Sequence, residues 1–271
     1  MRWLSKITSA DLLTLINGLL GMLAITYILD DKYVFAAMLI LMAVIVDGMD
    51  GIAARRFRKK HDFGRFLDSI SDAVSFCLAP GILIYSNYYD RDLGSAWSSV
   101  PNAAAVLASV LFVGFGLLRL ARFAGKDYLS SGFRGLPTPA AAMLVMIPCM
   151  LWGNQEFSPF SQGYELYPVA AWVIGLSIVM VSDMPYPKIR GKPALVVGTI
   201  LAVIILVMGL YIIEAGLELP YVEAFYILWV LLLCYLVAGP VYEVTRPGYV
   251  KPESRRKRRL ERRLRNKQAK T

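Results

Sequence analysis

An apolar run that ends in a cluster of acidic and small residues decides the fold of this chain. Residues 34–72 have the sequence VFAAMLILMAVIVDGMDGIAARRFRKKHDFGRFLDSISD. The run from Val34 to Val46 is apolar enough to lie in a membrane, where a carboxylate is costly and persists mainly when it binds something. We therefore expect the aspartates that follow this run to form a site at the edge of the bilayer.

The whole chain has the composition of an integral membrane protein. It has 271 residues, 57% of them hydrophobic, and the apolar residues lie in long blocks. We predict an all-α polytopic bundle of about eight transmembrane helices, because a straight helix needs ~20 residues to cross ~30 Å of hydrocarbon. The expected helices are roughly Asp11–Leu29, Val34–Ala53, Leu67–Tyr85, Ala103–Phe123, Pro139–Trp152, Pro168–Val181, Ala194–Ile213 and Tyr221–Val241.

The basic residues predict the orientation of the bundle. If both termini are cytoplasmic, every Lys and Arg except Lys32 and Arg91 falls on a cytoplasmic segment. The positive-inside rule then places both termini and the acidic cluster at the cytoplasmic face. We expect a multi-pass protein of the cytoplasmic membrane whose active site faces the cytoplasm.

The polar tail from Lys251 to Thr271 has two interpretations. It is either a solvated charge run that helps to set topology or a segment that adsorbs to anionic lipid headgroups, worth ~1 kcal/mol per basic residue near the surface. Nucleic-acid binding is not expected directly beneath a membrane span. Membrane lipids are therefore the expected surroundings of this tail.

The spacing of four aspartates predicts a metal site. Asp47 and Asp50 are three residues apart and Asp68 and Asp72 are four apart, so each pair projects from one face of a helix. If the two helix ends face each other, divalent cations would remove the repulsion between the carboxylates. Hard oxygen ligands with no nearby His or Cys favour Mg²⁺, Mn²⁺ or Ca²⁺. Two such ions held together can orient and neutralise a phosphoryl group during in-line displacement.

Small residues accompany the aspartates. A helical glycine costs roughly 1 kcal/mol relative to alanine, so Gly48 and Gly51 indicate that something needs the space. With Ala54 and Gly64 they would leave a groove for a phosphorylated group, or they would serve close helix contacts, as small residues often do in membranes. Arg55 is suited to bind a phosphate through two hydrogen bonds.

Residues 47–72 follow the spacing Asp-x2-Asp-Gly-x2-Ala-Arg-x8-Gly-x3-Asp-x3-Asp. This spacing is similar to the signature of the CDP-alcohol phosphatidyltransferase family at every defined position. This resemblance implies that an alcohol displaces CMP from a CDP-linked lipid. It implies that residues 1–190 form the family's six-helix membrane domain. Residues 191–245 would then add two transmembrane helices, and residues 246–271 would form a basic cytoplasmic tail.

The same resemblance implies roles for single residues. Asp47, Asp50 and Asp68 would ligate two divalent ions. Asp72 would complete the metal site and act as the catalytic base that deprotonates the acceptor hydroxyl. The residues implied in CDP binding are Gly48, Gly51, Ala54, Arg55 and Gly64, with Thr14 and Asn17 from the first helix.

Three further segments resemble the phosphatidylserine synthase branch of the family. They are RLARF at 119–123, FRGLPTPAAA at 133–142 and MVSDMPYPK at 180–188. That branch implies L-serine as acceptor and CDP-diacylglycerol or CDP-archaeol as donor. Arg119, Arg122 and Lys188 are cations suited to bind the serine carboxylate or the lipid phosphate, or they are ordinary positive-inside residues. Asp183 stands where a basic or neutral residue is expected.

Two alternatives stay open at this point. The same chemistry with glycerol 3-phosphate or inositol phosphate as acceptor would call for more cations than a zwitterionic amino acid does. A divalent-cation transporter could also place acidic residues in membrane helices, although the carboxylates here lie in two adjacent segments at one mouth. Metal-dependent release of CMP would separate a transferase from a transporter. A homodimer is compatible with this architecture.

Overall fold

The computed structural model describes residues 8–56, 62–90, 92, 95, 97, 99–124, 133–152, 166–187, 192–213 and 221–245. Of these, residues 50–56, 62, 133, 152, 192–196, 208–213, 221, 222 and 224 are described by their backbone alone. These residues form helices and one small β ribbon. The elements are α1 (Ser9–Leu29), α2 (Tyr33–Arg56), α3 (Asp62–Asp72), the π-helix η2 (Ala73–Leu78), α4 (Ala79–Tyr88), α5 (Val100–Ala124), β1 (Phe133–Arg134), α6 (Thr138–Trp152), α7 (Leu166–Val181), β2 (Pro185–Tyr186), α8 (Lys192–Ile213) and α9 (Tyr221–Thr245).

The helical segments confirm the predicted membrane bundle. Each of the eight expected apolar blocks corresponds to one segment, with α3, η2 and α4 joined into a single run. Among the described residues, four helices are long and apolar enough to cross a membrane, and four shorter ones are apolar. The long ones are Ser9–Leu29, Phe63–Tyr88, Val100–Ala124 and Phe225–Thr245, and the shorter ones are Tyr33–Met49, Thr138–Leu151, Leu166–Val181 and Val197–Val207.

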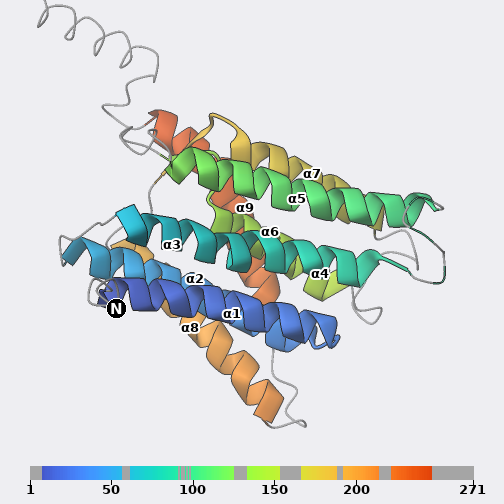
Figure 1. Ribbon diagram of the computed structural model, residues 1–271, viewed down its shortest axis with the longest axis horizontal. Coiled ribbons are helices and arrows are strands. Elements are labelled where there is room, and N and C mark those ends of the chain that lie inside the picture. The colour runs from blue at the N-terminus through green and yellow to red at the C-terminus, as the bar shows by residue number, and fades with distance from the viewer. Residues whose placement is uncertain are drawn as a thin grey trace, which may run out of the picture.

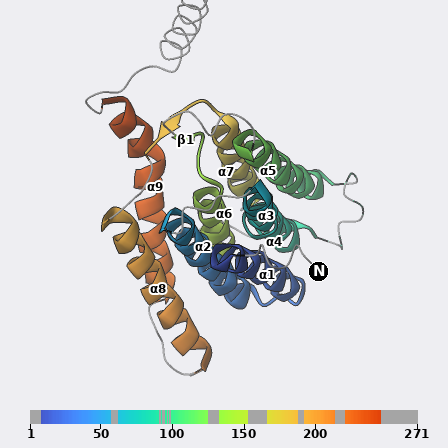
Figure 2. The ribbon, with the colours of Figure 1, turned by 60° about the vertical axis from the view of Figure 1, so that its left-hand side comes forward.

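Helix α6 is the centre of the bundle. Its residues from Ala140 to Ile147 are all buried, as is expected of a helix that is apolar all round. It contacts α2, α4, α7 and α9, and Figure 2 shows it among these helices, with α8 and α9 along one side of the bundle. In Figure 1 the helices α1 to α5 run roughly side by side, whereas α8 is inclined to them.

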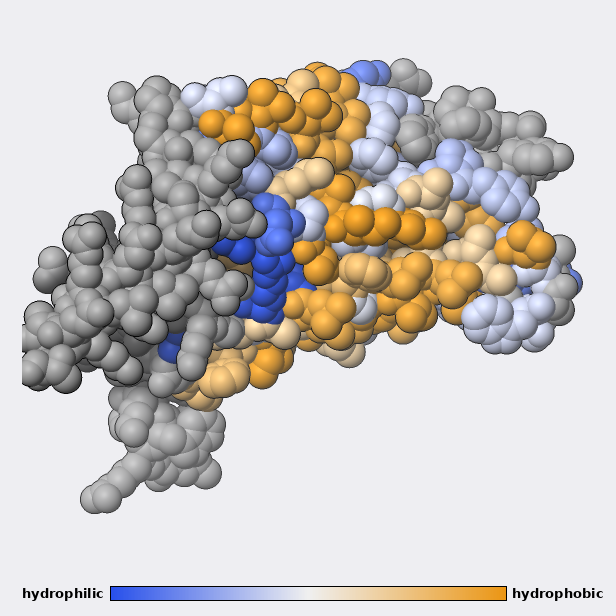
Figure 3. Space-filling view, turned by 90° about the horizontal axis from the view of Figure 1, so that it is seen from above, coloured by the Kyte–Doolittle hydropathy of each residue, from blue (hydrophilic) through white to orange (hydrophobic). Residues whose placement is uncertain are grey.

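The outer surface carries large apolar side chains, as a lipid-facing surface should. Leu12, Leu19 and Met22 on α1 and Val110 and Leu118 on α5 are each more than half exposed. Figure 3 shows apolar residues forming a broad band across the middle of the bundle, with hydrophilic residues toward its ends. The protein is therefore an integral membrane protein, and the orientation of its termini stays a prediction.

A two-stranded antiparallel ribbon of β1 and β2 is the one departure, in the described residues, from the predicted all-α fold. Phe133 pairs with Tyr186 and Arg134 pairs with Pro185. Gly135 follows with a φ of +74°, and a Cβ on it would lie 2.0 Å from the carbonyl oxygen of Met180, so only glycine fits. The ribbon ties the segment before α6 to the segment after α7.

Helix α9 is fastened to this ribbon. The hydroxyl of Tyr186 donates to the carbonyl of Leu236 at 3.2 Å, and the hydroxyl of Tyr235 donates to the carbonyl of Pro187 at 3.2 Å. The Tyr186 and Tyr235 rings lie 5.6 Å apart between centroids. The last helix is thus packed against the connection after α7, while the division into domains at residues 190 and 245 stays a prediction.

Candidate active site

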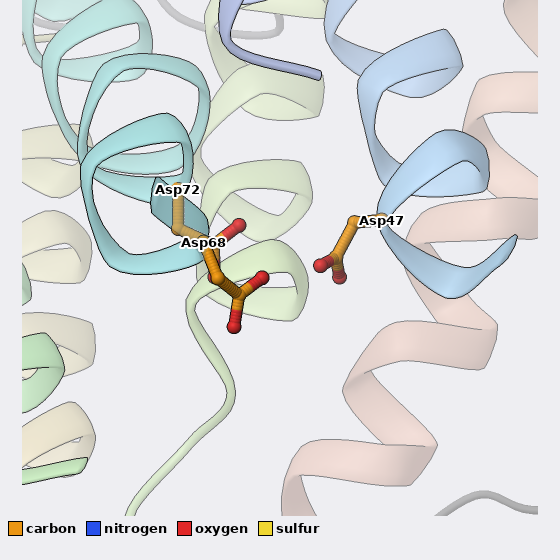
Figure 4. Close-up of side chains that lie close together, drawn as sticks. All are labelled: Asp47, Asp68 and Asp72. Carbon is orange, nitrogen blue, oxygen red and sulfur yellow. The ribbon is translucent and has the colours of Figure 1, made fainter. Parts of the chain in front are cut away.

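Three of the predicted acidic residues meet between α2 and α3. Asp47, Asp68 and Asp72 each offer a carboxylate oxygen, and these oxygens lie within 4.8 Å of one another. Figure 4 shows Asp47 on α2 opposite Asp68 and Asp72 on α3, with the carboxylates directed into a shared space. Asp50 lies one turn after Asp47 on α2, and its side chain is outside the described part of the structure.

This donor set fits a hard divalent cation. All three carboxylates are partly buried, and like charges so close together in a low dielectric would otherwise repel or protonate. A divalent ion removes that conflict and accepts several oxygen ligands at once. The geometry and chemistry of the cluster therefore agree with a divalent-metal site.

Gly48 and Gly64 of the signature have different surroundings in the structure. Among the described residues, a Cβ on Gly48 would meet no atom within 4 Å, so the described part of the structure leaves this face of α2 open. A Cβ on Gly64 would lie 2.7 Å from Oδ1 of Asp11, so Gly64 lets α3 approach the beginning of α1. Asp11 accepts hydrogen bonds from Thr8 and completes a capping box there.

The remaining signature positions lie in the last turns of α2. Gly51, Ala54 and Arg55 are helical, but their side-chain surroundings lie outside what the structure describes. Their assignment to CDP binding therefore stays a prediction.

Two residues of α1 were predicted to contact the nucleotide. Asn17 is fully buried, and its Nδ2 donates a hydrogen bond to Oδ1 of Asp72 at 3.1 Å. The Thr14 hydroxyl is also buried and donates to the carbonyl of Ala10 at 3.0 Å. No pattern in the sequence predicts the contact between Asn17 and Asp72, which are 55 residues apart.

Arg119 on α5 is a buried cation beside the acidic cluster. Only 5% of it is exposed, and its Nη1 donates to Oγ1 of Thr138 at 3.1 Å. Its Nε has no hydrogen-bond partner among the described residues. Asp72 and Asp47 lie close enough to interact electrostatically with the guanidinium.

Arg122, one turn further along α5, is engaged elsewhere. Its Nη1 donates to the carbonyl of Val181 at 3.0 Å, and its Nη2 is paired with Asp183. Arg134 on β1 lies 3.5 Å from the same carboxylate. The third predicted cation, Lys188, lies outside the described residues.

The pairing explains why an aspartate occupies position 183. The hydrogen bond from Arg122, together with the charges of Arg122 and Arg134, holds the pKa of Asp183 below its ordinary value and outweighs the opposing effect of its slight burial. Asp183 thereby joins the end of α5, the strand β1 and the turn after α7.

Comparison with known proteins agrees with this fold and site. The model of the family described as CDP-alcohol phosphatidyltransferase matches residues 7–181, which include the acidic cluster and run to the end of α7. This chain belongs to the CDP-alcohol phosphatidyltransferase family and is a membrane-bound transferase of substituted phosphate groups.

Particular relatives in this family are identical to the chain at about a third of the aligned positions. It is 36% identical to CDP-diacylglycerol–serine O-phosphatidyltransferase of Methanocaldococcus jannaschii, over 69% of this chain and 77% of that protein. It is 34% identical to archaetidylserine synthase of Methanothermobacter thermautotrophicus, over 70% of this chain and 75% of that protein. It is also 34% identical to CDP-diacylglycerol–serine O-phosphatidyltransferase of Helicobacter pylori, over 66% of this chain and 72% of that protein.

Proposed function

We propose that this protein transfers a phosphatidyl group from a CDP-linked lipid to L-serine, with release of CMP, in phospholipid biosynthesis. The observation that carries the proposal is the buried guanidinium of Arg119 beside the cluster of Asp47, Asp68 and Asp72. A cation for the serine carboxylate thus lies next to carboxylates suited to a metal-assisted displacement. The names of the relatives point to the same acceptor.

The chemistry is an in-line displacement at the lipid-bearing phosphorus. The serine hydroxyl oxygen forms the new bond to phosphorus, the bond to the bridging pyrophosphate oxygen breaks, and CMP leaves with that oxygen. The hydroxyl proton passes to Asp72, because an alcohol is a poor nucleophile until a positioned base removes its proton. Asp47, Asp68 and Asp72, with Asp50, would hold two Mg²⁺ or Mn²⁺ ions. When bound, such ions would neutralise the charge of the pyrophosphate.

Arg119 is proposed to bind the acceptor carboxylate. A buried guanidinium is costly unless an anion pairs with it, and Thr138 is a neutral partner. The edge that carries the unpartnered Nε suits a carboxylate, which arginine binds through two parallel hydrogen bonds. Binding of serine would thus complete the hydrogen bonding of Arg119 and hold the hydroxyl near Asp72.

A phosphorylated acceptor is a weaker candidate. Arg122 is paired with Asp183, so fewer described cations are available beside the cluster than the sequence alone suggested. Glycerol 3-phosphate or inositol phosphate would bring a second negative charge, and Arg119 is the buried cation that the described residues place beside the cluster to balance it. Membership of a transferase family leaves the cation-transporter alternative without support.

The donor is proposed to be CDP-diacylglycerol or CDP-archaeol, which have the same headgroup. The nucleotide would lie along the open face of α2 at Gly48, with Gly51, Ala54, Arg55 and Gly64 as the predicted contacts. We propose that this site opens to the cytoplasm from the cytoplasmic membrane. A homodimer remains compatible with the fold.

A parallel assay tests this function. Purified protein receives Mn²⁺ or Mg²⁺ with CDP-diacylglycerol or CDP-archaeol, and separately serine, glycerol 3-phosphate or inositol phosphate, while CMP is measured. We expect CMP release with serine that EDTA abolishes and excess metal restores. Release with glycerol 3-phosphate but none with serine would reject the proposed acceptor.

A further inference from the structure

Helix α1 contributes a buried amide to the acidic cluster from outside the signature. Asn17 is fully buried, and its Nδ2 lies 3.1 Å from Oδ1 of Asp72. A hydrogen bond to an ionised carboxylate is shorter and stronger than one between neutral groups. This contact therefore acts directly on the side chain that is proposed as the base.

The backbone of Asn17 is fixed as well as its side chain. The Ser75 hydroxyl donates to the carbonyl of Asn17 at 2.7 Å. A Cβ on Gly21 would lie 2.6 Å from the Cα of Ser75, and one on Gly18 would lie 3.0 Å from Oγ of Ser71. Helix α1 thus touches the backbone of the helix that carries Asp72, as small residues allow in membrane bundles.

The helix that carries Asp72 needs such a constraint at this point. Asp72 is the last residue of α3, and the π-helix η2 begins at Ala73. A π-helix replaces the i→i+4 hydrogen-bond pattern by i→i+5, and single turns of it are frequent at functional sites. The backbone therefore changes its hydrogen-bond pattern directly after the proposed base. Asn17 of α1 contacts both sides of this change, since its amide donates to Asp72 at the end of α3 and its carbonyl accepts from Ser75 in η2.

We infer that Asn17 is a positioning residue that sets the orientation of the Asp72 carboxylate toward Asp47 and Asp68. The amide holds Oδ1, so the plane of the carboxylate, and with it the direction of Oδ2, is fixed. An amide suits this task because it donates a hydrogen bond without adding charge to the cluster, whereas Lys would neutralise Asp72 and Asp would repel it. The inference rests on the role proposed above for Asp72.

Two variants and one control test this role. Asn17→Ala removes the amide, and Asn17→Leu keeps a side chain of similar size while removing the donor without adding charge. Ser177→Ala is the control, because Ser177 is also fully buried but donates within its own helix, to the carbonyl of Val173 at 2.7 Å. For each folded protein, the affinity for Mn²⁺ alone is measured by electron paramagnetic resonance without substrate, and kcat and KM are measured at saturating Mn²⁺.

We expect both Asn17 variants to bind Mn²⁺ more weakly and to lose kcat about 10- to 100-fold, as when a partner behind a metal ligand is removed. The KM for the CDP-lipid should change less than about threefold, because Asn17 acts through Asp72 rather than on the nucleotide. Ser177→Ala should match the wild type. A rise confined to the KM for the CDP-lipid, or wild-type Mn²⁺ affinity and kcat in both variants, would overturn the inference. If the wild type released no CMP with serine, the proposed function would fail, while the Mn²⁺ affinities would still decide the role of Asn17.

Discussion

Arg122 on α5 forms an ion pair with Asp183 in the turn after α7, and this pair gives Arg122 different surroundings from Arg119. The two arginines are three residues apart on one helix. Arg119 points into the bundle toward Thr138 and the acidic cluster, whereas Arg122 binds the carbonyl of Val181 and the exposed Asp183. We therefore expect substitution of Arg119 to weaken the binding of serine and substitution of Arg122 to lower thermal stability.

Arg119→Ala should raise the KM for serine while leaving the KM for the CDP-lipid nearly unchanged. Loss of a hydrogen bond to an ionised group is worth roughly 1.5 to 3 kcal/mol, or about a tenfold to hundredfold loss of efficiency. Initial rates of CMP release at varied serine and varied CDP-lipid measure this. A change confined to the KM for the CDP-lipid would show that Arg119 binds the donor rather than serine.

Arg122→Ala is the matched variant. It should leave the serine KM within about threefold of the wild type and lower thermal stability slightly, because an exposed ion pair contributes about 0 to 1 kcal/mol. Asp183→Asn should have a similar effect, and the double variant should be less than additive because the two residues are in contact. A large rise of the KM for serine in Arg122→Ala would contradict this structural role and indicate that Arg122 binds the acceptor.

The same pair predicts a pH dependence. The pKa of Asp183 is lowered from its ordinary value of 3.8, so its carboxylate is ionised in the folded protein at pH values where the unfolded chain begins to protonate. The stabilisation is fully present above about pH 4 and is lost as the pH falls through the folded pKa. Melting temperatures of wild type and Asp183→Asn should therefore converge at acid pH. The difference is small because the side chain is 75% exposed. A difference that grew with acid would contradict the pairing.

The aspartates are expected to separate into two functional groups. Asp47→Asn, Asp50→Asn and Asp68→Asn should lose Mn²⁺ binding and CMP release together, because each removes a charged ligand from a shared site. Asp72→Asn should keep most CMP affinity while turnover falls about 10²- to 10⁴-fold, the usual contribution of a general base. Near-normal turnover in any of the first three would contradict the ligand assignment. An equal loss of CMP affinity and turnover in Asp72→Asn would make Asp72 mainly a ligand.

The apolar segments and the helix faces that carry the acidic residues could be predicted, because both depend on local patterns. The blocks of hydrophobic residues predict the helices, and the three- and four-residue spacings place each pair of carboxylates on one helix face. That these faces meet is only a condition of the predicted metal site, and the structure brings Asp47, Asp68 and Asp72 together. The β ribbon could not be predicted in this way, because each strand has two residues and its partner lies about fifty residues away. The different surroundings of Arg119 and Arg122 likewise depend on Thr138 and Asp183, which are distant in sequence.

The orientation of the bundle can be tested by labelling. Because nearly all basic residues lie on one side of the predicted topology, a reporter fused after Thr271 should be cytoplasmic, and a cysteine placed within residues 153–165 should react from outside. The native Cys77, Cys149 and Cys234 would first be replaced by alanine so that only the new thiol reacts. Labelling that required permeabilised cells would overturn the predicted topology.

Gly48→Ala separates a nucleotide contact from a packing role. No atom of the described residues lies within 4 Å of a Cβ at this position, so the methyl group fits this part of the folded protein. Alanine also favours the helix by about 1 kcal/mol over glycine. We therefore expect unchanged or higher thermal stability together with a raised KM for the CDP-lipid, because only a bound ligand would meet the methyl group. Gly21→Ala is the contrasting variant, since its Cβ would lie 2.6 Å from the Cα of Ser75 and stability itself should fall. If Gly48→Ala kept a wild-type KM, the nucleotide would not lie on this face of α2.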